Sequence, residues 1–146
     1  MRIVGLDFGD VRLGFAVSDQ TGIIAMPLRV VDLRNGVSAE ESVRKVCEET
    51  GAEKLVIGLP VNMNASKGPM VTKVEAFIEL LSKKLTIPIE KWDERLSTSL
   101  VERMLIDADM SRAKRKGVRD KLAAQVILQG YLDMQNSGST SSYSYE

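Results

Sequence analysis

The sequence predicts an α/β domain built on a mixed five-stranded sheet, antiparallel at first and then parallel. Three short apolar segments, residues 2–8, 12–19 and 24–31, follow one another through tight turns, as the strands of a meander do. Two further apolar segments, residues 53–60 and 86–94, alternate with stretches of helical periodicity. Strands that alternate with helices pair in parallel through right-handed crossovers, so we expect helices to flank the sheet.

The first three strands each carry a local signal. Residues 2–8 are apolar with little alternation, which is typical of a strand covered on both faces. A tight link at Gly9 leads into residues 12–19, where large apolar residues alternate with smaller ones, and this favours a hairpin partner. Pro27 indicates a bulge or an edge position for the third strand, because proline cannot donate to a ladder.

The predicted helices have recognisable ends. Ser38 followed by Glu41 is the pattern of a capping box, and Gly51 is a natural stop for the helix that begins there. Residues 71–85 repeat apolar side chains at helical spacing, so an amphipathic helix is expected. Two more helices are predicted, one capped by Ser97 or Thr98 and running to about residue 107, the other at about residues 118–135.

Length and composition favour one soluble domain. The 146 residues and 16.1 kDa suffice to bury a core without disulfides or metals. We expect a single domain at residues 1–135 and a serine-rich, disordered tail at 136–146. No apolar run approaches the roughly 20 residues that span a bilayer. The start, "MRIVGLDFG", lacks the apolar core of a signal peptide. A cytoplasmic protein without a membrane segment is therefore predicted.

Two features of the composition restrict the chemistry. The chain has no histidine, which excludes an imidazole base, a serine–histidine relay and a histidine-ligated metal. Cys47 is the single cysteine, so neither an internal disulfide nor a thiolate zinc site is available. Lys and Arg total 20, as do Asp and Glu, and this zero net charge is an argument against a dedicated nucleic-acid binder. Carboxylates are the leading candidates for any catalysis.

Several acidic residues fall where strands of such a sheet end. Asp7 comes late in the first strand, where a buried carboxylate is costly unless it is paired or binds a metal. A structural salt bridge to Arg12 or Arg95 is the alternative for Asp7. Asp93 and Glu94 end the last strand, where carboxylates reaching solvent are equally compatible with the pattern. Ligands of such sheets gather at the carboxyl ends of the central strands, which favours a site there.

A metal would explain these acids together. Asp120 lies in the first turn of the last predicted helix, where it could also simply complement the helix dipole. With Asp7 and the acidic pair at 93–94 it would form a hard oxygen site suited to Mg²⁺ or Mn²⁺. Two such ions about 4 Å apart can activate water and stabilise the leaving oxygen in phosphodiester cleavage, with no histidine required.

Two segments could contact a polyanionic substrate. A basic run lies between the last two predicted helices, and such a run is either a solvated loop or a clamp for a phosphate backbone. The loop at residues 61–69 could contribute polar contacts through Asn62, although it has neither P-loop nor dinucleotide spacing. The basic run comprises Arg112, Lys114, Arg115, Lys116, Arg119 and Lys121.

Four ordered motifs resemble those of one known family. The stretches "GLDFGDVRLGFAVSD", "VIGLPVNMNASKGP", "DERLST" and "RDKLAAQVIL" are similar to the YqgF (RuvX-like) family of pre-16S rRNA nucleases and Holliday junction resolvase homologues, and the resemblance extends over about residues 3–132. The resemblance implies a ribonuclease H-like fold and a Mg²⁺- or Mn²⁺-dependent nuclease with acidic ligands. By position, the family's acids fall on Asp7, on the pair in "DERLST" and on Asp120. Within the pair we favour Glu94, with Asp93 as the alternative.

The favoured hypothesis is a metal-dependent endonuclease. Asp7, Glu94 and Asp120 would be the catalytic metal ligands, and pre-16S rRNA, cut near its 5′ end during ribosome biogenesis, would be the substrate. A Holliday junction resolvase and a non-catalytic RNA-binding assembly factor remain alternatives. So does an ATPase of the actin and sugar-kinase type, because "DFGDVRLG" resembles its acid–glycine turn, although that architecture needs two facing domains. The chain is expected to act as a monomer or as a homodimer, which paired nicks in a junction would require.

Overall fold

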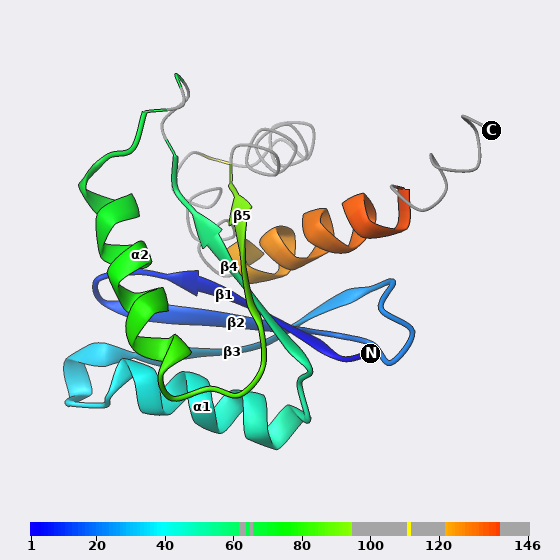
Figure 1. Cartoon of the computed structure of the whole chain (residues 1–146), viewed down its shortest axis with the longest axis horizontal. Helices are drawn as coiled ribbons and strands as arrows, with labels where there is room; N and C mark the ends of the chain where they lie inside the picture. The colour runs from blue at the N-terminus through cyan, green and yellow to red at the C-terminus, as the bar shows by residue number, and fades with distance from the viewer. Residues whose placement is uncertain (62–63, 65, 95–110, 112–121, 138–146) are drawn as a thin grey trace.

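The computed structural model describes residues 1–61, 64, 66–94, 111 and 122–137, and the structural statements that follow concern those residues. They form a central five-stranded sheet with helices on both faces (Figure 1). The sheet has the order β3-β2-β1-β4-β5. Its strands are β1 (Ile3–Phe8), β2 (Arg12–Ser18), β3 (Ala25–Asp32), β4 (Lys54–Leu59) and β5 (Ile89–Asp93).

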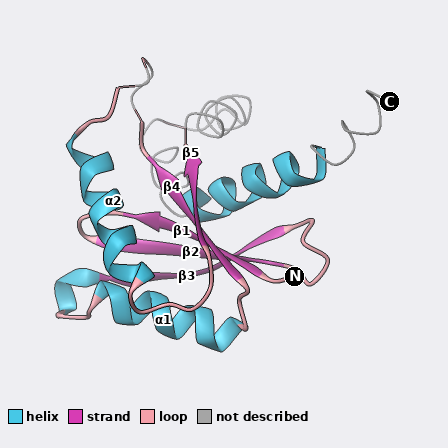
Figure 2. Ribbon diagram, in the orientation of Figure 1, coloured by secondary structure: helices cyan, strands magenta, loops and turns pink. Residues whose placement is uncertain are grey.

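The sheet is mixed, as the sequence predicts. β1, β2 and β3 pair as an antiparallel meander, whereas β4 and β5 extend the sheet in parallel on the other side of β1. The crossover from β1 to β4 includes the α1 helix, and the crossover from β4 to β5 includes the α2 helix (Figure 2). The carboxyl ends of β1, β4 and β5 therefore meet at one edge of the sheet.

Three helices of the described part of the chain cover the sheet. α1 (Ala39–Thr50) and α2 (Pro69–Ser82) lie on one face, and a C-terminal helix at residues 122–137 lies on the other (Figure 2). A short 3₁₀ turn, η1 (Leu33–Asn35), connects β3 to the segment that leads into α1. The C-terminal helix continues two residues past the predicted end at 135. The predicted helix that runs to about residue 107, and the tail beyond residue 137, lie outside the described residues.

An edge position and a bulge, the two features that Pro27 indicates for the third strand, are both confirmed. β3 lies at an edge of the sheet, so the missing N–H of Pro27 costs no ladder bond to a further strand. The register between β2 and β3 also shifts, between Phe15 and Ala16, so that Phe15 pairs with Arg29 and Ala16 with Pro27. This shift is the expected bulge, and it keeps an otherwise extended edge strand irregular.

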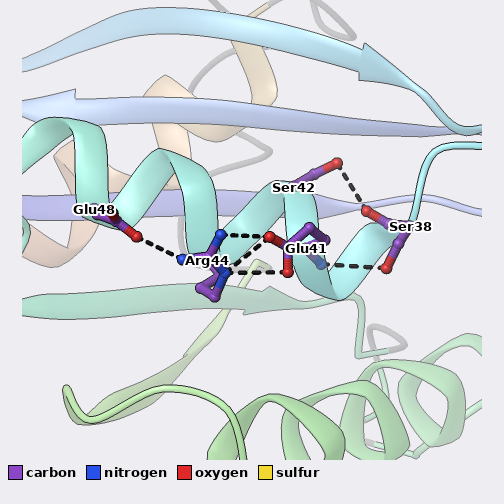
Figure 3. A network of polar contacts seen from close by, with 5 residues as sticks. All are labelled: Ser38, Glu41, Ser42, Arg44 and Glu48. Carbon is purple, nitrogen blue, oxygen red and sulfur yellow. Dashed lines mark hydrogen bonds and ion pairs between the residues drawn. The ribbon is translucent and has the colours of Figure 1, made fainter.

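The start of α1 follows half of the predicted capping box. The Ser38 hydroxyl accepts from the Glu41 backbone N–H at 3.2 Å, as an N-cap should (Figure 3). The Glu41 carboxylate, however, accepts from Arg44 at 2.9 Å instead of reaching back to the cap, and Arg44 also pairs with Glu48 (Figure 3). A cation one turn further along the helix thus competes with the cap, and the full capping box is not formed.

Two apolar layers fix which face each strand residue occupies. Toward α1 and α2, the first layer includes Val4 and Leu6 of β1. Toward the C-terminal helix, the second layer includes Ile3 of β1. Side chains alternate along a strand, so Asp7 belongs to the same face as Ile3 and Gly5. The strand thereby directs its one acidic residue toward the C-terminal helix side of the sheet.

The Ser38 cap is open to a direct test. Ser38→Ala removes the acceptor for the Glu41 N–H, and the free energy of unfolding should fall by about 1 kcal/mol. Ser38→Asp keeps an acceptor at the N-cap and should retain most of the stability. Urea denaturation of the three proteins measures both effects, and equal stability of Ser38→Ala and the parent would contradict the assignment.

Candidate active site

Two acidic residues lie on one face of the sheet at the carboxyl ends of its parallel strands. Asp7 is the second-last residue of β1, and Glu94 directly follows the last residue of β5. β4 lies between them in the sheet, and Leu6 pairs with Ile57 while Leu59 pairs with Asp93. The Glu94 N–H donates to the Leu59 carbonyl at 3.0 Å, so the chain after β5 stays attached to β4. The predicted convergence of strand ends is therefore present for these two acids.

Glycines on both sides of Asp7 let other groups come close to the backbone of the sheet. Gly14 of β2 pairs with Asp7, and a Cβ at Gly14 would lie 3.7 Å from the Cβ atoms of both Asp7 and Ala124. A Cβ at Gly58 of β4 would lie 2.9 Å from Glu94 Cγ and 2.6 Å from Ile127 Cδ1. Ala124 and Ile127 belong to the C-terminal helix, so both acids lie on the face that this helix covers.

The same geometry separates Glu94 from Asp93. Trp92 packs edge-on against Tyr131 of the C-terminal helix, with ring centroids 6.1 Å apart. Lys91 instead pairs with Glu75 of α2 at 3.2 Å, on the opposite face. Strand alternation therefore assigns Asp93 to the α2 side. The Glu94 side chain lies over Gly58 on the side that carries Asp7, which supports the preference for Glu94 within the acidic pair.

The electrostatics of Glu94 reflect this position. Burial raises its pKa from 4.5 to about 7, and the charges of Asp7 and Asp93 act in the same direction. A carboxyl group with such a pKa lies near the point of half protonation at neutral pH. A cation between Glu94 and Asp7 would relieve the repulsion and return Glu94 to its charged form. Strongly shifted acids of this kind are characteristic of functional sites.

The C-terminal helix beside these acids is fixed to the edge of the sheet. Gln129 accepts from the Ala25 N–H at 2.9 Å and donates to the Ile23 carbonyl at 2.9 Å, while Gln125 donates to the Ala25 carbonyl at 3.1 Å. These side-chain amides hydrogen-bond to backbone groups at the start of the edge strand β3. They fix the position of the helix along its own axis as well as against the sheet. Ala124 and Ile127 therefore have fixed positions next to Asp7 and Glu94.

The other predicted site residues have different outcomes. Among the described residues no group of three or more His, Cys, Asp or Glu side chains could hold a metal ion. Arg12, one salt-bridge partner considered for Asp7, begins β2 in register with Asp32, and Arg95 is not described. The remaining predicted site residues also lie outside the described part of the chain, namely Asn62, Arg112, Lys114, Arg115, Lys116, Arg119 and Asp120.

Cys47 takes no part in the site. It is buried in α1, on the opposite face of the sheet, and burial raises the pKa of its thiol to about 11. A thiol with that pKa is almost entirely protonated at neutral pH, whereas the thiolate is the form that acts as a nucleophile or metal ligand.

Sequence reasoning missed two glycines that lie beside these acids. Gly14 and Gly58 each lie inside a strand, where glycine is intrinsically unfavourable. That placement is itself a signal, since a glycine within a strand often marks the close approach of another group. The sequence does not say which group approaches, because the neighbours of Gly58 come from residues 36 and 69 positions further along the chain.

Comparison with known proteins places the chain in a family. A family model described as "RuvX: Holliday junction resolvase" matches residues 1–134. A protein of Halothermothrix orenii is 47% identical over 136 residues, covering 93% of this chain and 97% of its own. A protein of Desulforamulus reducens is 48% identical over 133 residues, covering 91% and 97%. Both carry the name "Putative pre-16S rRNA nuclease".

Solved structures with little sequence similarity share the fold. RuvC of Thermus thermophilus, solved with a Holliday junction substrate, superposes with a TM-score of 0.57 at 17% identity, covering 94% of this chain and 96% of its own. The fowlpox virus resolvase with junction DNA gives 0.51 at 12%, covering 96% and 99%. These likenesses confirm the ribonuclease H-like fold. The family model and the relatives together show that the chain belongs to the RuvX family.

Proposed function

We propose that this chain is a divalent-metal-dependent endonuclease that hydrolyses phosphodiester bonds in structured nucleic acid, with pre-16S rRNA as its substrate. The observation that carries the proposal is the pair of Asp7 and Glu94 on one face of the sheet, at the carboxyl edge of parallel strands. Relatives that are 47% and 48% identical are named as nucleases of pre-16S rRNA, and this name supports the choice of substrate.

The donor set fits a hard divalent cation. Carboxylate oxygens are the ligands preferred by Mg²⁺ and Mn²⁺, and the site holds no thiolate or imidazole that would favour a softer metal. When bound between carboxylates, such ions supply an activated water and stabilise the leaving oxygen of a phosphodiester. We propose Asp7 and Glu94 as two of the ligands. Asp93 is the alternative to Glu94, but its strand position favours the opposite face.

Asp120 is proposed as the third carboxylate. It precedes Ala124 in the sequence by four residues, the spacing of one helical turn. The Ala124 Cβ would lie 3.7 Å from a Cβ at Gly14, as would the Asp7 Cβ, so Ala124 is close to Asp7. The spacing supports a role for Asp120 at the same site. Replacing Asp120 by its amide, as for the other two acids, tests this role.

Phosphate contacts are proposed for the basic run and for Asn62. Neutralising phosphates is the main source of sequence-independent affinity for nucleic acid, and its signature is a strong dependence on salt. Cleavage that weakens steeply with added salt in the parent protein, but less steeply when Arg115 and Lys116 are replaced, would support this assignment.

We further propose that the protein acts in the cytoplasm. No helix in the described part of the chain is long and apolar enough to span a membrane.

A second candidate substrate is four-way junction DNA. The description of the matching family model, a Holliday junction resolvase, favours it. Resolution by paired nicks needs two active sites, and a homodimer is the simplest way to supply them. A single cleavage of precursor RNA has no such requirement, so the two substrates also differ in the oligomeric state that they demand.

One experiment separates these functions. The purified protein is incubated with a pre-16S rRNA fragment and with a synthetic four-way junction, each with Mn²⁺ and with EDTA. We expect Mn²⁺-dependent cleavage of the RNA. Cleavage of the junction alone would favour the resolvase, and salt-sensitive RNA binding with no cleavage of either substrate would indicate a non-catalytic assembly factor.

Asp7→Asn should abolish cleavage. Removing a residue that only hydrogen-bonds to a metal ligand typically lowers metal affinity or activity 10- to 100-fold. Removing a ligand itself should therefore lower the cleavage rate at least about a hundredfold. Asp10→Asn is the matched control, because it makes the same charge change three residues away. Asp10 is exposed in the β1–β2 turn, where it pairs with Lys73 at 3.0 Å. Metal-dependent cleavage by Asp7→Asn at the parent rate would contradict the proposed site.

Glu94→Gln should stabilise the metal-free protein at alkaline pH. Folding raises the pKa of Glu94, so the neutral form is favoured in the folded state and the charged form carries a penalty. That penalty is absent below pH 4.5, grows as the pH rises and is complete above about 7. In EDTA at pH 8, Glu94→Gln should therefore unfold at higher urea concentration than the parent, and the difference should vanish toward pH 4.5.

Glu90→Gln provides a control of opposite sign on the same strand. Hydrogen bonds from Lys54 and Tyr131 lower the pKa of Glu90, so its charged form is favoured by folding. At pH 8 this substitution should destabilise the protein. If both substitutions lowered stability at pH 8, Glu94 would not be a buried, repelled carboxylate.

A further inference from the structure

Gly58 is the most crowded position beside the site. A Cβ added there would lie 2.6 Å from Ile127 Cδ1, 2.9 Å from Glu94 Cγ and 3.0 Å from Glu94 Cδ. These separations are far below ordinary van der Waals contact, so a methyl group could enter only if a neighbour moved. Ile127 and the Glu94 side chain, including its carboxyl carbon, therefore crowd the space that a side chain at position 58 would need.

The Glu94 backbone has little freedom to move away. Its N–H donates to the Leu59 carbonyl at 3.0 Å, and the preceding residue, Asp93, pairs with Leu59 in the parallel ladder. A side chain at position 58 would therefore displace the side chain of Ile127 and rotate that of Glu94 off the surface of β4. Such a rotation would change the position of the carboxylate and leave the fold of the strand unchanged.

We propose that Gly58 is a positioning residue of the metal site, because its missing side chain lets the Glu94 carboxylate lie over β4 on the same face as Asp7. This inference rests on the proposed function. Gly58 follows Ile57 in β4 as Asp7 follows Leu6 in β1, and Leu6 pairs with Ile57. Position 58 thus separates the two acids in the sheet, and a bare backbone there allows one cation to contact both carboxylates.

Two other glycines on this face make different contacts and serve as matched controls. A Cβ at Gly14, on the other side of Asp7, would meet Asp7 and Ala124 at an ordinary 3.7 Å. A Cβ at Gly5 would lie 2.7 Å from Leu128 Cβ and 3.2 Å from the Ala124 carbonyl, so it would disturb the packing of the C-terminal helix. Gly14→Ala therefore tests added bulk alone, and Gly5→Ala tests disturbed helix packing away from Glu94.

The test is the affinity of the folded protein for Mn²⁺, measured by electron paramagnetic resonance of the free ion at a temperature where each variant is folded. Gly58→Ala should bind Mn²⁺ about tenfold more weakly, the effect expected when a ligand loses its orientation. Gly14→Ala and Gly5→Ala should bind as the parent does, although Gly5→Ala should have a lower Tm. Parent affinity in Gly58→Ala would overturn the inference.

A second variant separates the effect on Glu94 from the effect on Ile127. Ile127→Val removes the Cδ1 atom that a Cβ at position 58 would approach most closely. Any loss of Tm that Gly58→Ala suffers through Ile127 should recover in Gly58→Ala/Ile127→Val. The Mn²⁺ affinity of this double variant should stay low, because the contact between position 58 and Glu94 remains. This double variant also gives a folded protein to measure if Gly58→Ala alone does not fold. Recovery of the affinity together with the Tm would assign the effect to helix packing and overturn the inference.

Asp7→Asn in the same titration keeps the two levels of proposal distinct. If the parent protein does not bind Mn²⁺, or if Asp7→Asn binds it equally well, the proposed metal site itself fails. If Asp7→Asn loses affinity and Gly58→Ala does not, the metal site stands and the positioning role of Gly58 is wrong.

Discussion

The placement of two half-buried carboxylates on one face of the sheet is the constraint on which the rest of the site depends. Asp7 and Glu94 come from strands on either side of β4, and Glu94 lies directly over the Gly58 backbone. Burial and neighbouring negative charge together raise the pKa of Glu94. A divalent cation bound between the two acids would offset this effect.

The scaffold keeps this arrangement rigid from both faces. On one side, α1 and α2 pack on an apolar layer that includes Leu6 and Ile57, the residues next to Asp7 and Gly58. On the other, the C-terminal helix is held by its apolar contacts and by Gln125 and Gln129 at the edge strand. Each acid therefore lies at the end of a well-ordered strand, as a precisely placed ligand must.

Much of the fold could be predicted from the sequence because its signals are local. Alternation, glycine stops and Pro27 specify the meander, the edge strand and the ends of α1 with little tertiary information. The capping box at Ser38 is half wrong because Arg44 engages the Glu41 carboxylate, a competition that the four-residue pattern does not include. Local patterns thus predict elements well and predict the partners of charged side chains less well.

The candidate site was predictable only in part. Asp7 is a candidate because of its place in an apolar strand, but a strand end does not decide between Asp93 and Glu94. The structure favours Glu94 through its contact with Gly58, which depends on how β4 and β5 pair. The part assigned to Asp120, Asn62 and the basic run stays a prediction.

The most direct measurement is a crystal structure of the protein grown with Mn²⁺, with the ion located by its anomalous scattering. The account predicts Mn²⁺ on the face of the sheet covered by the C-terminal helix, coordinated by oxygens of both Asp7 and Glu94 beside the Gly58 backbone. An ion bound by Asp93 on the α2 side, or no ion at Asp7 under conditions that support cleavage, would contradict it.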